Sequence, residues 1–120
     1  MDSNQASLVL SENDIQNGIL EFLRFKKIVA WRNNNGAVYD DKAGSFRRKN
    51  KWEIIHGDPV DILGILPDGR FLAIEVKKNE KEKATPGQIK FMKKINKNGG
   101  VAFKAFSVRC VKVQLENDLS

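Results

Sequence analysis

The sequence is poor in cysteine and histidine, and this scarcity excludes two kinds of site. Cys110 is the one cysteine among 120 residues, so no disulfide can form within the chain, and we expect a reducing, intracellular setting such as the cytoplasm of a bacterial or phage-infected cell. His56 is the one histidine, so the chain lacks the histidine and cysteine cluster that a zinc site requires. A metal site would therefore have to use oxygen ligands.

Long apolar runs are also missing. No segment approaches the length of a membrane span. The first 14 residues, MDSNQASLVLSEND, lack the basic start and the apolar stretch of a signal peptide. We therefore expect neither membrane insertion nor secretion.

Positive charge, by contrast, is in excess. The chain has 21 lysine and arginine residues against 15 aspartate and glutamate residues, which gives a formal net charge of +6. Hydrophobic residues make up 41% of the chain, enough for the core of one compact domain. The charge favours an anionic partner, most commonly nucleic acid, although a soluble basic protein without such a partner has the same composition.

Hydrophobic spacing and capping residues predict one α/β domain over residues 11–120, after a tail or short strand over residues 1–10. Ser11 and Thr85 begin two predicted helices, and Ser107 begins a third, whose pattern also fits a strand. The predicted strands are 28–32, 60–66, 70–77 and 101–107, with a further short one near 37–39. The polar and basic segment 42–59 is interpreted as a long loop.

The turn Leu66-Pro67-Asp68-Gly69-Arg70 sets the register of a predicted β-hairpin. Proline and aspartate suit the centre of a type I turn, and glycine suits the left-handed position that follows it. This three-residue loop pairs Leu66 with Arg70, so Asp61 pairs with Glu75; a shift of one residue would turn Asp61 to the other face.

Two carboxylates that lie opposite each other on a sheet repel, and a divalent cation such as Mg²⁺ or Mn²⁺ would compensate. Lys77 lies on the same face as Glu75, and the alternative interpretation is a cross-strand salt bridge between Lys77 and one of the acids. Glu12 precedes Ile15 and Ile19 on the inward face of the first helix and is expected near the pair. An acid that only favours the start of the helix is the alternative for Glu12.

The segment from GDPVD to FKAFS resembles the virus-type replication-repair nuclease (VRR-NUC) domain of the PD-(D/E)xK nuclease superfamily, on the pattern D-x(13)-E-V-K followed by T-x-x-Q. The resemblance spans about Ser11 to Ser107. It implies an α/β fold with a restriction-endonuclease-like core, a central four-stranded mixed β-sheet flanked by helices. The spacing departs from the family's G-x-x-D, because three residues separate Gly57 from Asp61, and Asp58 is thus a rival first ligand.

The resemblance also implies the roles of individual residues. Asp61 and Glu75 would bind the metal, the backbone carbonyl of Val76 would be a further ligand, and Glu12 would match the acid of the family's first helix. Lys77 would be the catalytic lysine, which orients the attacking water or stabilises the developing charge. Gln88 would assist catalysis, although it also completes a helix cap.

The resemblance implies phosphodiester hydrolysis in DNA and no organic cofactor. Residues expected to bind nucleic acid are Arg32, Asn33, Asn35, Arg47, Arg48, Lys49, Lys51, Lys90, Lys93 and Lys94, together with Lys42. Phe46 and Trp52 would stack on an opened base or pack the loop on the sheet, and an ordinary turn is the alternative for Arg32, Asn33 and Asn35.

The predicted substrate is branched DNA such as a Holliday junction, cut by a homodimer whose two sites match a two-fold target. A flap nuclease or duplex-cutting nuclease is the alternative among enzymes. A DNA-binding module without catalytic activity and a subunit that binds an acidic protein are the alternatives of other classes.

Overall fold

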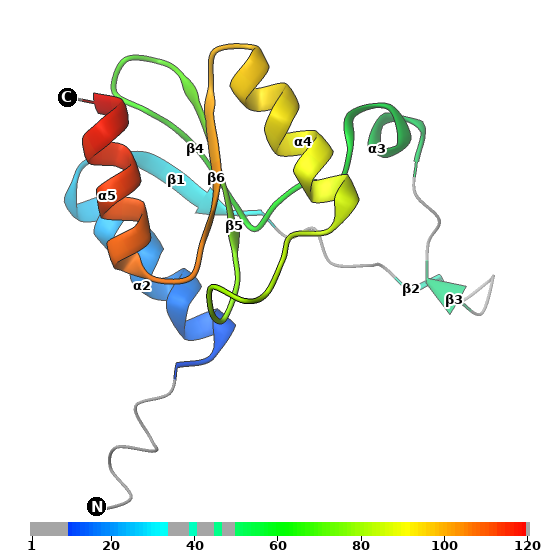
Figure 1. Cartoon of the computed structure of the whole chain (residues 1–120), viewed down its shortest axis with the longest axis horizontal. Coiled ribbons are helices and arrows are strands. Elements are labelled where there is room, and N and C mark those ends of the chain that lie inside the picture. Colours follow the sequence, from blue (N-terminus) through cyan, green and yellow to red (C-terminus); the bar gives the residue numbers. More distant parts are fainter. Residues whose placement is uncertain (1–9, 34–38, 41–44, 47–49, 120) are drawn as a thin grey trace, which may run out of the picture.

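The central sheet has four strands in the order β1 (Val29–Arg32), β4 (Ile62–Ile65), β5 (Phe71–Val76) and β6 (Val101–Ala105). The computed structural model of the protein describes residues 10–33, 39–40, 45–46 and 50–119. Neighbouring strands are antiparallel except β5 and β6, which are parallel (Figure 1). The predicted four-stranded mixed sheet is thus confirmed.

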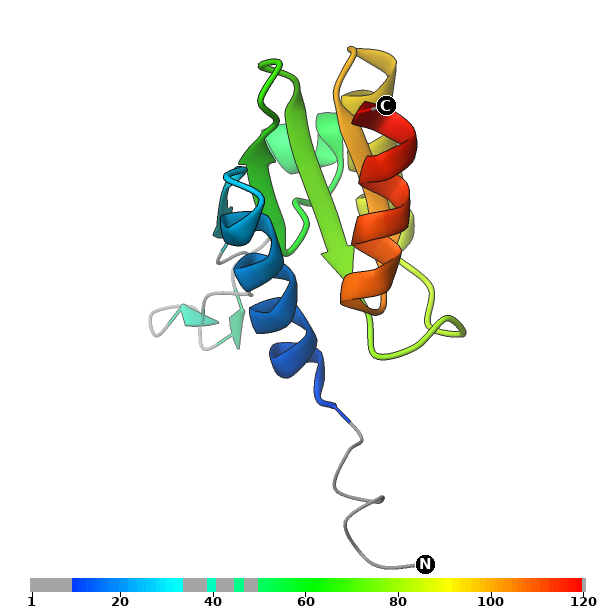
Figure 2. The same ribbon diagram turned by 90° about the vertical axis from the view of Figure 1, so that its left-hand side faces the viewer.

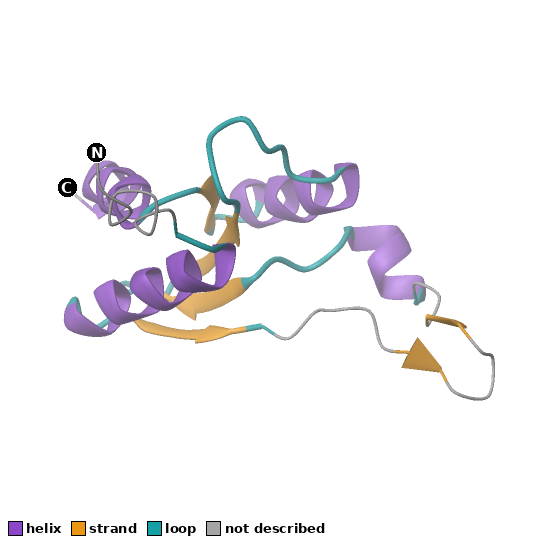
Figure 3. Cartoon of the chain, turned by 90° about the horizontal axis from the view of Figure 1, so that it is seen from below, coloured by secondary structure: helices purple, strands orange, loops and turns teal. Residues whose placement is uncertain are grey.

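Helices cover the sheet unequally. The helices α2 (Glu12–Phe25) and α5 (Val108–Leu119) lie side by side on one face, and α4 (Pro86–Lys97) lies on the other (Figures 2 and 3). The larger core lies under α2 and α5, and includes Ile19, Leu23 and Ile74. The smaller core joins α4 to β5 and β6. Ile65, at the end of β4, is exposed on that face.

Helix ends follow the predicted caps. The Ser11 hydroxyl accepts a hydrogen bond from the Asp14 N–H at 3.1 Å, and the Asp14 carboxylate accepts one from the Ser11 N–H. Ser107 accepts a bond from the Cys110 N–H, so the ambiguous C-terminal segment is a helix. No helix in the described part of the chain is long and apolar enough to cross a membrane.

The interpretation of segment 42–59 as a loop is wrong, because residues Lys51–His56 form the short helix α3. Asn50 caps this helix, its side chain accepting a bond from the Glu53 N–H, and the Glu53 carboxylate accepts one from the Asn50 N–H. Gly57 ends the helix with a φ of 95°. The N-x-x-E pattern was the available signal, but six residues are too few to show helical periodicity.

A two-stranded ribbon, β2 (Tyr39–Asp40) with β3 (Ser45–Phe46), lies before α3 in the chain. Tyr39 belongs to the short strand expected near residues 37–39, whose other two residues lie outside the described part. Residues 1–9 of the predicted tail also lie outside it.

Candidate active site

The β4–β5 hairpin has the predicted register. The Gly69 N–H donates to the Leu66 carbonyl at 2.8 Å, and Gly69 has a φ of 92°. The Leu66 N–H donates to the Arg70 carbonyl at 2.9 Å, and the pairing of β4 with β5 continues to Ile62 and Ile74. One residue further along, Asp61 and Glu75 are therefore opposite each other.

Asp61 is held by its neighbours on both sides. Its Oδ2 atom accepts a hydrogen bond from the Val76 N–H at 2.9 Å, so the carboxylate leans across the end of β4 toward β5. Its carbonyl accepts a bond from the Asn33 N–H at 2.7 Å, and the Asn33 side chain donates to the Val60 carbonyl at 3.2 Å. Asn33 thus fixes the backbone that presents Asp61.

Asp58, the rival of Asp61 in the sequence, lies elsewhere. Its N–H donates to the Gly87 carbonyl at 2.9 Å, and its Oδ2 atom is so close to Gly87 that a Cβ at that glycine would be 2.1 Å away. Asp58 therefore packs on the first turn of α4, and the register favours Asp61 as the partner of Glu75.

Glu75 is a buried acid, with 2% of its surface exposed. Its Oε2 atom lies 3.1 Å from Lys77 Nζ, whereas Oε1 has no hydrogen-bond partner in the described part of the chain. Burial, and after it the charge of Asp61, raise the pKa of Glu75 to about 7, against the opposing effect of Lys77. A second positive charge beside Oε1 would relieve this.

Lys77 is positively charged in this setting. Partial burial lowers its pKa, but the bond to Glu75 and the charges of Glu75, Glu12 and Asp61 outweigh burial, so the pKa is raised. A lysine held in its charged form stabilises negative charge and does not accept a proton. The structure thus has an ion pair between Lys77 and one of the acids, but it joins residues two positions apart at the end of β5 and does not cross from one strand to the other.

Glu12 lies within the electrostatic field of the cluster. Partial burial raises its pKa, and the charge of Asp61 adds to this. The start of α2 thus lies near the carboxylate pair, as expected from the sequence. Among the described residues, however, no three acidic, histidine or cysteine side chains form a metal-binding group. Glu12 is therefore not placed as a direct ligand.

The residues at this corner fit a divalent cation held by two carboxylates. Asp61 and Glu75 offer oxygen donors of the kind that Mg²⁺ and Mn²⁺ prefer, and Mg²⁺ commonly keeps several water or phosphate ligands beside one or two carboxylates. The buried Oε1 atom of Glu75 is the observation that favours a cation here, because this oxygen accepts no hydrogen bond from the described residues while Oε2 is paired with Lys77.

Gln88 is engaged by one end of its side chain. Its side-chain Oε1 atom accepts a hydrogen bond from the Thr85 backbone N–H at 2.9 Å, while the Gln88 backbone N–H donates to the Thr85 hydroxyl at 3.1 Å. The capping box at the start of α4 is confirmed. A contact of Gln88 with a substrate would have to use the amide nitrogen.

Several residues that the sequence assigned to DNA make contacts inside the protein. Arg32 donates to the side chains of Asn13, at 2.6 Å, and Asn17, both on α2. Lys90 donates to the Ile54 carbonyl at 2.8 Å and ties α4 to α3. Since their partners are 15 to 36 residues away in the chain, sequence spacing gave no signal for these contacts.

The other predicted DNA-binding residues fall into two groups. Lys51 and Lys93 are exposed and Lys94 is half-buried. Trp52 is 68% exposed and stacks on His56 with ring centres 5.6 Å apart. Outside the described part of the chain lie Asn35, Lys42, Arg47, Arg48 and Lys49, and the side chain of Phe46 is not described either.

Comparison with known proteins supports the fold. No family model and no curated protein sequence matches the chain. A solved structure described as a VRR_NUC domain superimposes with a TM-score of 0.60 and 23% sequence identity, over 88% of this chain and 94% of that chain. The protein therefore has the fold of a VRR_NUC domain, as the sequence resemblance implied.

Proposed function

We propose that the protein is a metal-dependent nuclease that hydrolyses phosphodiester bonds within DNA. The observation behind the proposal is the buried Glu75 opposite Asp61, with one carboxylate oxygen unpartnered among the described residues and Lys77 alongside. The VRR_NUC fold and the net charge of +6 point the same way.

Each residue of the site has a distinct task in this proposal. Asp61 and Glu75 would hold Mg²⁺ or Mn²⁺, which when bound polarises a phosphate and acidifies a water. Lys77, held in its charged form by Glu75, stabilises the negative charge that develops on the phosphate oxygens. Asn33 keeps Asp61 in place through Val60, and Gln88 offers its amide nitrogen to a phosphate oxygen or a water.

The test is a cleavage panel in Mg²⁺ with junction, flap, splayed, duplex and single-stranded DNA. Wild-type protein should cut at least one of these, and Glu75→Ala should bind the same DNA without cutting it. Glu80→Ala, at an exposed acid of the loop after β5, is the matched control and should cut like wild type. Cleavage by Glu75→Ala at the wild-type rate would exclude this site.

We propose branched DNA as the substrate and a homodimer as the active form, because one site cuts one strand and a two-fold target needs two sites. Sedimentation with a four-way junction should show two protein chains for each junction. A monomer on the junction, combined with preferred cutting of flaps or duplex, would support the alternative nuclease class. Binding without nicking of supercoiled plasmid would identify a DNA-binding module without catalytic activity.

A further inference from the structure

The sheet face that bears Glu75 continues into an open surface. Side chains alternate along β5, so Phe71 lies on the same face as Glu75. The cross-strand pair Ile65 and Phe71 follows the opposed Asp61 and Glu75 along this face, after the pair Leu63 and Ala73. Four residues along a strand span about 13 Å, so Phe71 lies about that far from the carboxylates.

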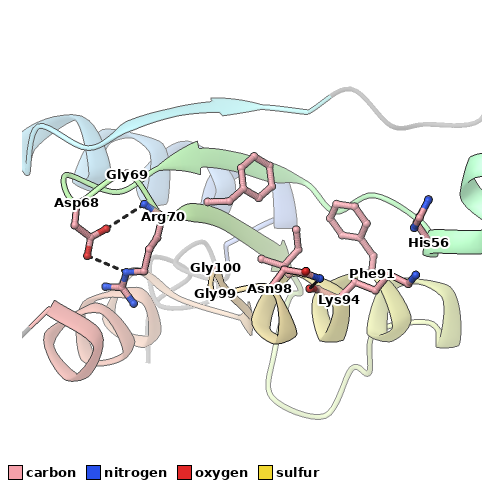
Figure 4. A pocket seen from close by; sticks show the side chains of 11 residues that line it. His56, Asp68, Gly69, Arg70, Phe91, Lys94, Asn98, Gly99 and Gly100 are labelled. Carbon is pink, nitrogen blue, oxygen red and sulfur yellow. Dashed lines mark hydrogen bonds and ion pairs between the residues drawn. The ribbon is translucent and has the colours of Figure 1, made fainter.

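A groove of about 610 Å³ lies beside Phe71, between the β4–β5 hairpin and α4. Figure 4 shows the lining from Asp68 and Arg70 at one end to His56 at the other, with Phe91, Lys94 and Asn98 of α4 along one wall. Phe71 is 37% exposed, and Phe91 is half-buried. Two aromatic rings from different elements are thus available to one ligand.

The charge of the groove is positive. Arg70 Nε lies 2.8 Å from Asp68 Oδ2, so the one acid of the lining is paired. Lys94 lines the groove. It also lines a neighbouring groove on α4, whose lining includes Lys90, Lys93 and Lys97 as well. A ligand that suits this lining has a flat apolar surface and a negative charge, and a nucleotide has both.

We propose that this groove binds an unpaired nucleotide of the DNA substrate, with its base against Phe71 and Phe91 and its phosphate near Lys94. The proposal rests on the nuclease function above and specifies its branched substrate as one with an unpaired nucleotide next to the cut. A base inside a duplex cannot enter, because its faces are stacked on its neighbours.

The experiment uses splayed DNA with 2-aminopurine in the unpaired arm and no divalent metal, so that binding is measured without cutting. Wild-type protein should quench the fluorescence, because 2-aminopurine loses emission when it stacks on a ring. Phe71→Ala should abolish the quenching and weaken binding roughly 5- to 140-fold, the range for loss of one stacked base. Phe71→Trp should retain both.

Ile65→Ala is the matched control, because Ile65 pairs with Phe71 on the same face and is 44% exposed but does not line the groove. It should quench and bind like wild type. Thermal melting of each variant shows whether it is folded, and Phe71→Trp provides the comparison if Phe71→Ala is not.

Unchanged quenching in Phe71→Ala would overturn the proposal, as would an equal loss in Ile65→Ala. Wild-type quenching in Phe71→Ala combined with an altered sedimentation coefficient would assign the groove to a protein contact instead. A wild-type protein that stacks the base but cuts no DNA in Mg²⁺ would leave this groove supported and refute the nuclease function.

Discussion

The Nζ atom of Lys77 lies 3.1 Å from Oε2 of Glu75, and this ion pair balances the charge of one carboxylate while that of Asp61 remains. Two carboxylates face each other at the end of the hairpin, and one lysine cannot balance both. The pKa of Glu75 is therefore raised to about 7, chiefly by burial. The arrangement costs stability unless a cation binds.

Glu75→Gln should separate stability from activity. The variant removes the buried charge and keeps the shape, so the free energy of unfolding at pH 8 without metal should rise by about 1–3 kcal/mol. Cleavage in Mg²⁺ should fall by more than about 100-fold, because a metal ligand is lost. Urea melts and cleavage rates measure the two effects. Glu21→Gln, at an exposed acid paired with Arg24, should change neither.

The stability of the metal-free protein should depend on pH through Glu75. Its folded pKa is about 7 and its ordinary value is 4.5, so between these values the folded state holds a proton that the unfolded state has released. The free energy of unfolding should therefore fall as pH rises from about 4.5 to 7, by up to about 3 kcal/mol, and level off above.

The measurement is a series of urea melts in EDTA from pH 5 to 8, read as the difference between wild type and Glu75→Gln. The difference isolates Glu75 from the other acids. Mg²⁺ should restore stability above pH 7 and do little below pH 6, because protons compete for the carboxylates. A difference that does not change with pH would show that Glu75 is charged throughout.

Asn33→Asp should weaken metal-dependent cutting without weakening DNA binding. The change keeps the size of the side chain but removes the donor to the Val60 carbonyl, so the backbone before Asp61 loses a support. Loss of such a supporting contact commonly costs about 10- to 100-fold in metal affinity or activity. The Mg²⁺ concentration for half-maximal cleavage should rise.

DNA affinity measured in EDTA decides between this role and the direct DNA contact expected from the sequence. Asn79→Asp, in the exposed loop after β5, is the control, because it adds the same negative charge away from Val60 and shows how much that charge alone weakens DNA binding. If Asn33→Asp weakens DNA binding in EDTA more than Asn79→Asp does, Asn33 contacts the DNA directly.

The sequence predicted the hairpin register because Pro67, Asp68 and Gly69 determine it locally. Helix ends were equally predictable, since a cap and its partner are three residues apart. Contacts between distant elements were not. Arg32 reaches residues 15 and 19 positions away, and the groove combines His56, Phe71 and Phe91 from three elements. Tertiary packing brings these together, and no local pattern reports it.

Gly57→Ala should destabilise the junction of α3 and α4 severely. A Cβ at Gly57 would lie 2.4 Å from the Gly87 carbonyl oxygen and 2.6 Å from the Phe91 nitrogen, in a backbone with a φ of 95°. The left-handed backbone alone costs about 1–2 kcal/mol, and the backbone clash adds to it. Gly69 has a similar φ of 92°, but a Cβ there would meet open space, so Gly69→Ala should lose only the stability that the left-handed backbone costs. Equal melting temperatures for the two variants would contradict this.

Gln88→Glu should distinguish capping from a role with substrate. The Oε1 atom of Gln88 accepts the Thr85 N–H, and a glutamate keeps that acceptor, so the melting temperature should stay within a few degrees of wild type. The change removes both amide hydrogens and adds a negative charge, so cleavage should fall if the amide contacts a phosphate or a water.

Thr85→Ala is the reciprocal variant for Gln88. It removes the hydroxyl that accepts the Gln88 N–H, which should cost about 1 kcal/mol of stability, while the Gln88 amide is retained. Cleavage measured well below the melting temperature should then stay near the wild-type rate. If Gln88→Glu cuts normally and Thr85→Ala does not, Gln88 serves to cap α4, and catalysis depends on the position of that helix instead.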